Sequence, residues 1–193
     1  NKVLTKEGSP YIISDRIQLT PGVTLTIEAG AVINGQYMAM DGGTPAQIDL
    51  IGSAKLIISG TAVEPVNLTD IEIRHHEGHG GQGSMNITYL NMINGAIISS
   101  RENAVNISYS QLQWLYTSPL DNYAMGGIVL YGVPAVHQSL VHNELTGSWI
   151  KIVDWNRETE GHIDISENLW SSSKLELAGG TLSGSSSINI SAN

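Results

Sequence analysis

The sequence returns five times to a four-residue pattern in which apolar and polar residues alternate. The copies are Val66–Thr69, Met85–Thr88, Val105–Ser108, Ile163–Ser166 and Ile188–Ser191. Alternation indicates a strand with one buried face. The first three copies return about every 20 residues, and the interval from Asn106 to Asp164 is close to three more such periods. A strand that returns with this period is typical of a solenoid, in which each coil buries its apolar side against its neighbours. We therefore predict an all-β chain that forms a parallel β-helix of about nine coils.

This alternation also predicts which side chains fill the core. The apolar members of the five copies should point inward and stack in register: Val66 and Leu68, Met85 and Ile87, Val105 and Ile107, Ile163 and Ile165, Ile188 and Ile190. The polar members between them should form one outward row: Asn67, Asn86, Asn106, Asp164 and Asn189. Four further asparagines near strand ends, Asn91, Asn94, Asn143 and Asn168, should form hydrogen-bonded ladders at turns, because asparagine tolerates left-handed backbone.

Two segments near the N-terminus carry a family resemblance. Residues 21–33 (PGVTLTIEAGAVI) contain Glu-x-Gly, and residues 54–66 (AKLIISGTAVEPV) contain Gly-Thr-x-x-x-Pro. Over residues 9–70 the chain resembles the right-handed parallel β-helix repeat proteins of bacterial surfaces and secretions. The resemblance implies a right-handed solenoid. Because that family includes adhesins, polysaccharide-degrading enzymes and spacers, it leaves the function open.

No composition break or linker divides the chain, so we expect one β-helix domain over residues 1–193. Four segments read as loops expelled from the coils: residues 34–47, 74–83, 114–127 and 154–161. The N-terminal residues do not have the form of a signal peptide. We therefore expect a module of a larger exported protein, located outside the cell or at its surface.

Charge and composition exclude several classes of function. The net charge is −9, with 9 Lys+Arg against 18 Asp+Glu, which disfavours nucleic acid and anionic membranes as partners. The chain has no cysteine, and therefore no thiol nucleophile and no cysteine-based metal site. No apolar run approaches the ~18 residues of a membrane-spanning helix, so we expect no membrane insertion. No cofactor is expected.

One histidine cluster, His75, Glu77 and His79, is a weak candidate for a metal site. It is one residue short of His-Glu-x-x-His, and its glycines exclude the helix which that zinc motif needs. The two alternatives are a metal site on a loop and a polar excursion whose histidines face solvent.

Aromatic and polar residues gather in the second half of the chain. Aromatic faces stack on sugars while neighbouring carboxylates and amides hold hydroxyl groups, so this composition predicts a shallow carbohydrate site. The predicted ligand-binding residues are Trp114, Tyr116, Asp121, Tyr123, Trp149, Asp154 and Trp155. The alternative is that these aromatic residues cap the core beneath long loops.

Three hypotheses of function follow, of which the third is a passive spacer in a long fibrous protein. We favour a non-enzymatic adhesin-type or carbohydrate-binding module, with a polysaccharide or cell-surface glycan as its partner. The alternative is a polysaccharide lyase or glycoside hydrolase that uses Asp121, Asp154 and Glu158, since a glycosidase needs two carboxyl groups facing one bond.

Overall fold

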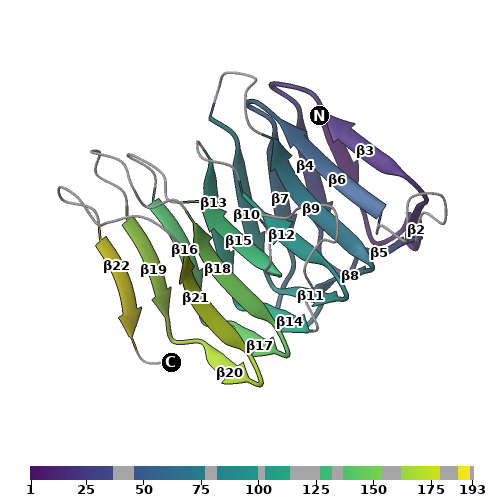
Figure 1. Cartoon of the computed structure of the whole chain (residues 1–193). Coiled ribbons are helices and arrows are strands. Elements are labelled where there is room, and N and C mark those ends of the chain that lie inside the picture. The colour runs from purple at the N-terminus through teal and green to yellow at the C-terminus, as the bar shows by residue number, and fades with distance from the viewer. Residues whose placement is uncertain are drawn as a thin grey trace.

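Three parallel sheets make up the whole of the described molecule. The computed structural model describes residues 1–36, 46–76, 82–99, 103–113, 127–131, 137–153, 162–178 and 187–191. These residues form twenty-two strands, β1 to β22, and no helix. Every third strand along the chain lies in the same sheet, beside the strand one coil earlier (Figure 1). The all-β parallel β-helix predicted from the repeat is confirmed.

Each sheet takes one strand from each coil. The first sheet holds β1 (Lys2–Leu4), β4 (Thr24–Glu28), β7 (Lys55–Ser59), β10 (Ser84–Thr88), β13 (Ala104–Ser108), β16 (His137–Val141), β19 (His162–Ser166) and β22 (Ser187–Ser191). The second sheet holds β2 (Tyr11–Ile13), β5 (Val32–Gly35), β8 (Val66–Thr69), β11 (Leu90–Ile93), β14 (Gln111–Gln113), β17 (Glu144–Thr146) and β20 (Leu169–Ser171). The third sheet holds β3 (Arg16–Leu19), β6 (Ala46–Ile51), β9 (Ile71–His76), β12 (Ala96–Ile98), β15 (Ile128–Tyr131), β18 (Trp149–Val153) and β21 (Lys174–Ala178).

The described strands make seven complete coils, and β22 begins an eighth. The coils are therefore fewer, and on average longer, than the nine or so that the sequence predicted. One inward row of the first sheet shows the reason. Its register partners are Ile27, Ile58, Ile87, Ile107, Leu140, Ile165 and Ile190. Only the step from Ile87 to Ile107 has the predicted length, because the connections between strands differ from coil to coil. The interval from Asn106 to Asp164 is therefore two coils and not three, with Ser139 as the intermediate partner.

One of the five repeat copies lies in a different sheet from the other four. Val66–Thr69 is β8 of the second sheet, whereas the others belong to the first. Asn67 therefore pairs with Asn91, not with Asn86. Val66 and Leu68 are buried as expected. The assignment of this copy to the same outward row was wrong because all three sheets alternate in the same way, so alternation alone does not distinguish them.

The core register within the first sheet is otherwise as predicted. Met85 pairs with Val105 and Ile87 with Ile107, and all four are at most 1% exposed. Ile163 and Ile165 are buried in the same rows, and Ile188 and Ile190 continue them. Ile190 is nevertheless 48% exposed, because no described strand lies beyond β22 to cover it.

Polar side chains connect the coils along the outside of the first sheet. The amide of Asn106 donates to Asn86 Oδ1 at 3.1 Å, and the hydroxyl of Ser139 donates to Asn106 Oδ1 at 2.9 Å. Further along, Asn189 donates to Asp164 Oδ1 at 3.0 Å. These side chains hold adjacent coils in register on the solvent side.

A second ladder is buried at the turn between the first and second sheets. The Asn143 amide donates to the carbonyl of Ile107 at 3.0 Å, and the Asn168 amide donates to that of Leu140 at 2.8 Å. Asn168 Oδ1 also accepts the backbone N–H of Asn143 at 2.9 Å. The predicted asparagine ladder is therefore present at Asn143 and Asn168. Of the other two candidates, Asn94 has left-handed backbone, and Asn91 bonds Asn67 on the outside of the second sheet.

The opposite orientations of Ile107 and Asn106 generate a stability prediction. Ile107→Ala should lower the free energy of unfolding by about 2–5 kcal/mol, because it leaves a cavity between coils on both sides. Asn106→Ala removes only outward hydrogen bonds, which contribute about 0.5–1.5 kcal/mol each. Urea unfolding of both variants measures the difference, and a larger loss for Asn106→Ala would contradict this register.

Candidate functional site

The outward side chains on the middle strands of the third sheet are shielded from solvent, unlike those of the other two sheets and of β3, β18 and β21. In β6, every residue from Ala46 to Leu50 is buried, and β12 is buried throughout. Strands of the first sheet instead alternate buried with half-buried or exposed residues. Outward groups on these middle strands therefore lie in a setting of low dielectric, where charges interact more strongly than in bulk water. This outer face of the third sheet is the candidate functional site.

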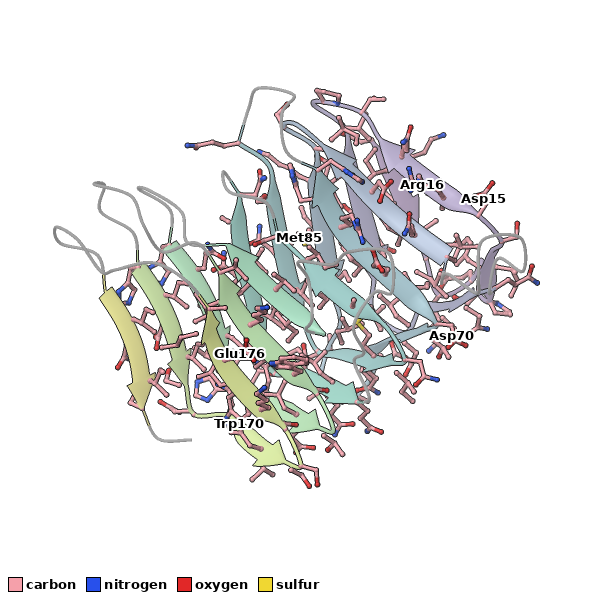
Figure 2. All side chains as sticks on the ribbon, viewed as in Figure 1. Asp15, Arg16, Asp70, Met85, Trp170 and Glu176 are labelled. Atoms are coloured by element: carbon pink, nitrogen blue, oxygen red, sulfur yellow. The ribbon has the colours of Figure 1, made fainter. Side chains whose placement is uncertain are left out.

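An arginine–carboxylate cluster lies at the N-terminal part of this face. It consists of Arg16, Gln47, Asp49, Glu72, Arg74 and His76, from β3, β6 and β9. Figure 2 shows the side chains of these strands, with Arg16 labelled. Arg16 Nε lies 3.0 Å from Asp49 Oδ2 and 2.9 Å from Gln47 Oε1. The Asp49 oxygen also lies 3.2 Å from His76 Nε2. Arg74 donates from Nε to Glu72 Oε1 at 2.7 Å.

Both carboxylates of this cluster are fully buried, since the Asp49 and Glu72 side chains are each 0% exposed. A buried carboxylate is stabilised only when a cation or hydrogen-bond donors replace its lost hydration. Arg16 forms an ion pair with Asp49 and Arg74 with Glu72, so the cluster joins the first three coils at the third sheet, although neither Asp49 oxygen has a hydrogen-bond partner among the described residues. Neither carboxylate faces solvent, and a substrate bond has no open approach to them. The cluster is therefore structural.

A second group, the Trp149 quartet, lies further along the same face. It consists of Trp149 and Lys151 on β18, and of Lys174 and Glu176 on β21. Trp149 pairs with Lys174 and Lys151 with Glu176, so the four side chains form two adjacent outward rows. Glu176 is labelled in Figure 2, toward the C-terminal end of the molecule.

Lysine contacts define the geometry of the quartet. Lys174 Nζ lies 4.2 Å from the centroid of the Trp149 ring, a cation–π contact. The same ammonium bonds Glu176 Oε2 at 2.8 Å, while Lys151 Nζ is 3.8 Å from Glu176 Oε1. The hydrogen bond from Lys174, with the charges of both lysines, lowers the pKa of the Glu176 carboxyl. The indole Nε1 of Trp149 is buried and has no hydrogen-bond partner.

Cations of the described chain concentrate on this face. The described residues include seven lysines and arginines: Lys2, Lys6, Arg16, Lys55, Arg74, Lys151 and Lys174. Four of them, Arg16, Arg74, Lys151 and Lys174, project from the third sheet, beside Asp49, Glu72 and Glu176. Among the described residues of this sheet, the cations therefore outnumber the carboxylates by one, in a chain whose net charge is −9.

Of the predicted ligand-binding residues, the structure describes Trp149 alone, and it lies on the candidate face. Trp114, Tyr116, Asp121, Tyr123, Asp154 and Trp155 lie outside the described residues, as does Glu158 of the alternative catalytic set.

His75, the first of the weak metal candidates, points into the core. The segment from Arg74, predicted to leave the coil, instead continues β9 through His76. His75 is 4% exposed and takes the inward position paired with Leu50. Glu77 and His79 lie outside the described residues. No group of three metal-ligating side chains is found within the part of the chain that the structure describes.

Hydrogen bonds around His75 define its protonation. Asn103 Oδ1 accepts the backbone N–H of Gly83, which turns the Asn103 amide nitrogen toward His75 Nδ1 at 2.8 Å. That amide nitrogen can only donate, so Nδ1 accepts and Nε2 carries the proton. Nε2 then donates to the carbonyl of Gly52 at 2.8 Å. His75 is thus a neutral residue that connects three coils, with both ring nitrogens engaged.

The charged residues of the third sheet were not singled out from the sequence, although a signal was present. Gln47-Ile48-Asp49-Leu50, Glu72-Ile73-Arg74 and Lys174-Leu175-Glu176 each alternate charged or polar with apolar residues. Alignment of the third strand of every coil would have placed these residues in two outward rows.

No protein-family model, curated protein or solved structure matches the chain. Among the described residues, no helix is long and apolar enough to cross a membrane.

Arg74 provides a test of the arginine–carboxylate cluster. Arg74→Met should lower the free energy of unfolding by about 3–5 kcal/mol, because it removes a cation from the buried Glu72 carboxylate. The double variant Arg74→Met/Glu72→Met should recover part of this loss, since it also removes the buried carboxylate that Arg74→Met leaves without its arginine. Lys6→Met, at the exposed ion pair with Glu64, is the control and should cost far less. Chemical denaturation measures all three, and equal losses for Arg74→Met and Lys6→Met would show that the cluster is not a buried ionic network.

Proposed function

We propose that this chain is a non-enzymatic, extracellular β-helix module that binds a glycan along the outer face of its third sheet. The observation that carries the proposal is the Trp149 quartet. It places an indole N–H without a partner beside two lysine side chains, on a face built from parallel strands. An aromatic residue surrounded by hydrogen-bonding groups is suited to sugars, which present apolar faces and hydroxyl groups together.

Coil stacking favours an extended ligand. Neighbouring strands lie roughly 4.8 Å apart, so outward residues of successive coils form a regular series along the solenoid. A polymer lying along this direction meets β18 and β21 in turn, whereas a small ligand meets one coil. A polysaccharide or cell-surface glycan fits this arrangement, and an adhesin-type role at a bacterial surface is consistent with it.

We favour binding over catalysis because the carboxylates of the arginine–carboxylate cluster are buried. The Asp49 and Glu72 side chains are fully buried and are held by arginines, whereas a glycosidase needs two carboxyl groups that face one bond about 5–10 Å apart. The lyase or hydrolase alternative would have to use Asp121, Asp154 and Glu158, which lie outside the described residues.

Glycan-array binding followed by calorimetry tests the proposal. We expect binding by the unmodified chain and at least about a tenfold loss of affinity for Trp149→Ala, in line with the cost of removing a central aromatic contact. Trp149→Phe keeps a ring but lacks the N–H, and its affinity should lie between that of the unmodified chain and that of Trp149→Ala.

Tyr109→Ala is the matched control. Tyr109 is an aromatic residue that is 50% exposed, but it lies at the turn between the first and second sheets, so its loss should leave affinity unchanged. Failure to bind any glycan, or unchanged binding by a folded Trp149→Ala variant, would refute the proposal. Release of oligosaccharides from a polysaccharide would establish the enzymatic alternative instead.

A further inference from the structure

We infer that the glycan bound at the outer face of the third sheet is acidic, and that its carboxylate or sulfate groups bind to Lys151, Lys174 and the indole N–H of Trp149. This inference rests on the proposed function and adds the chemical class of the ligand.

The charge balance of the quartet is the first observation. Two lysines share the single carboxylate of Glu176, so the quartet carries one excess positive charge. Lys174 takes the hydrogen bond at 2.8 Å, and Lys151 is left at 3.8 Å, beyond hydrogen-bond distance. The Lys151 side chain is only 14% exposed. An ammonium group that has lost most of its hydration, and that shares its one counter-charge with a closer lysine, is a favourable place for an anion.

Hydrogen-bonding capacity is the second observation. Trp149 Nε1 can only donate, each ammonium group can only donate, and Glu176 is the one acceptor side chain of the quartet. The Nε1 donor is buried and has no partner. A ligand that completes this site must therefore supply acceptor oxygens. Carboxylate and sulfate groups supply several oxygens together with the negative charge.

An apolar cluster beside the quartet strengthens the attraction. Ala96, Ile98 and Val129 are buried on the same outward face, with Val153 packed against them. Val129 is the register partner of Lys151 on the preceding strand. Because this border has a low dielectric, the lysines interact more strongly with an anion than they would in open solvent. The rest of a chain with net charge −9 repels acidic polymers, which confines their binding to this face.

Three polymers with one backbone test the inference: dextran, carboxymethyl-dextran and dextran sulfate, titrated into the intact chain by calorimetry. We expect binding of the carboxylated polymer, the sulfated polymer or both, and at least about tenfold weaker binding of neutral dextran, in line with the loss of a charge-assisted hydrogen bond. Comparison of carboxymethyl-dextran with dextran sulfate shows which anionic group is preferred. Affinity should fall as salt is raised from low to physiological concentration.

Lysine variants locate the site. Lys151→Gln and Lys174→Gln should each weaken binding of the charged polymer by about tenfold or more. Lys55→Gln is the matched control, because it makes the same change of charge on the outer side of the first sheet and should leave affinity within about twofold, as long-range charge effects are screened. Unfolding midpoints confirm that the variants are folded.

Several outcomes would overturn the inference. Equal binding of neutral and charged dextrans, or binding of neutral glycans alone on the array, would show that the ligand is not acidic while leaving the proposed function intact. Equal losses of affinity for Lys55→Gln and Lys151→Gln would show that the interaction is non-specific electrostatic attraction. Binding to anionic phospholipid vesicles but to no acidic polymer would assign the site to a membrane surface. Absence of all glycan binding would refute the proposed function as well.

Discussion

Parallel pairing between successive coils is the interaction on which the rest of the structure depends. No coil has a core of its own, because its apolar side chains are covered by the coils before and after it. Residues with neighbours on both sides, such as Ile87 and Ile107, are at most 1% exposed, whereas Ile190 on the last strand is 48% exposed. The buried amides of Asn143 and Asn168 maintain this pairing at the turn, where backbone groups would otherwise lack partners.

The same register creates the candidate site. Trp149 and Lys174 are one full coil apart in sequence, and pairing of β18 with β21 brings them into contact. The arginine–carboxylate cluster arises in the same way from β3, β6 and β9. The two groups differ in charge: the first has two arginines for two buried carboxylates, while the second has two lysines for one carboxylate and an indole N–H without a partner among the described residues. This difference makes the first a structural network and favours the second as a binding site for acceptor groups.

Alternation predicted the fold and much of the core, because the apolar members of each repeat must face inward wherever the strand lies. It could not tell which sheet holds Val66–Thr69, since all three sheets have the same period of two. It also missed that Arg74, His75 and His76 continue β9, because glycine and histidine nearby suggested a loop. Trp149 was predicted as a ligand-binding residue because aromatic and polar residues gather in the second half of the chain. Its partner Lys174 was not predicted, because the contact depends on the pairing of β18 with β21, which the predicted period of about 20 residues does not give.

Hydroxyl-radical footprinting with and without dextran sulfate tests the central claim most directly. The method measures side-chain accessibility. The chain carries reactive reporters at three positions around the solenoid: Trp149 on the third sheet, His137 on the first, and Tyr109 at the turn between the first and second. Binding along the third sheet predicts that oxidation of Trp149 falls when the polymer is added, while oxidation of His137 and Tyr109 does not change. Protection of His137 or Tyr109 with unchanged oxidation of Trp149 would contradict the account.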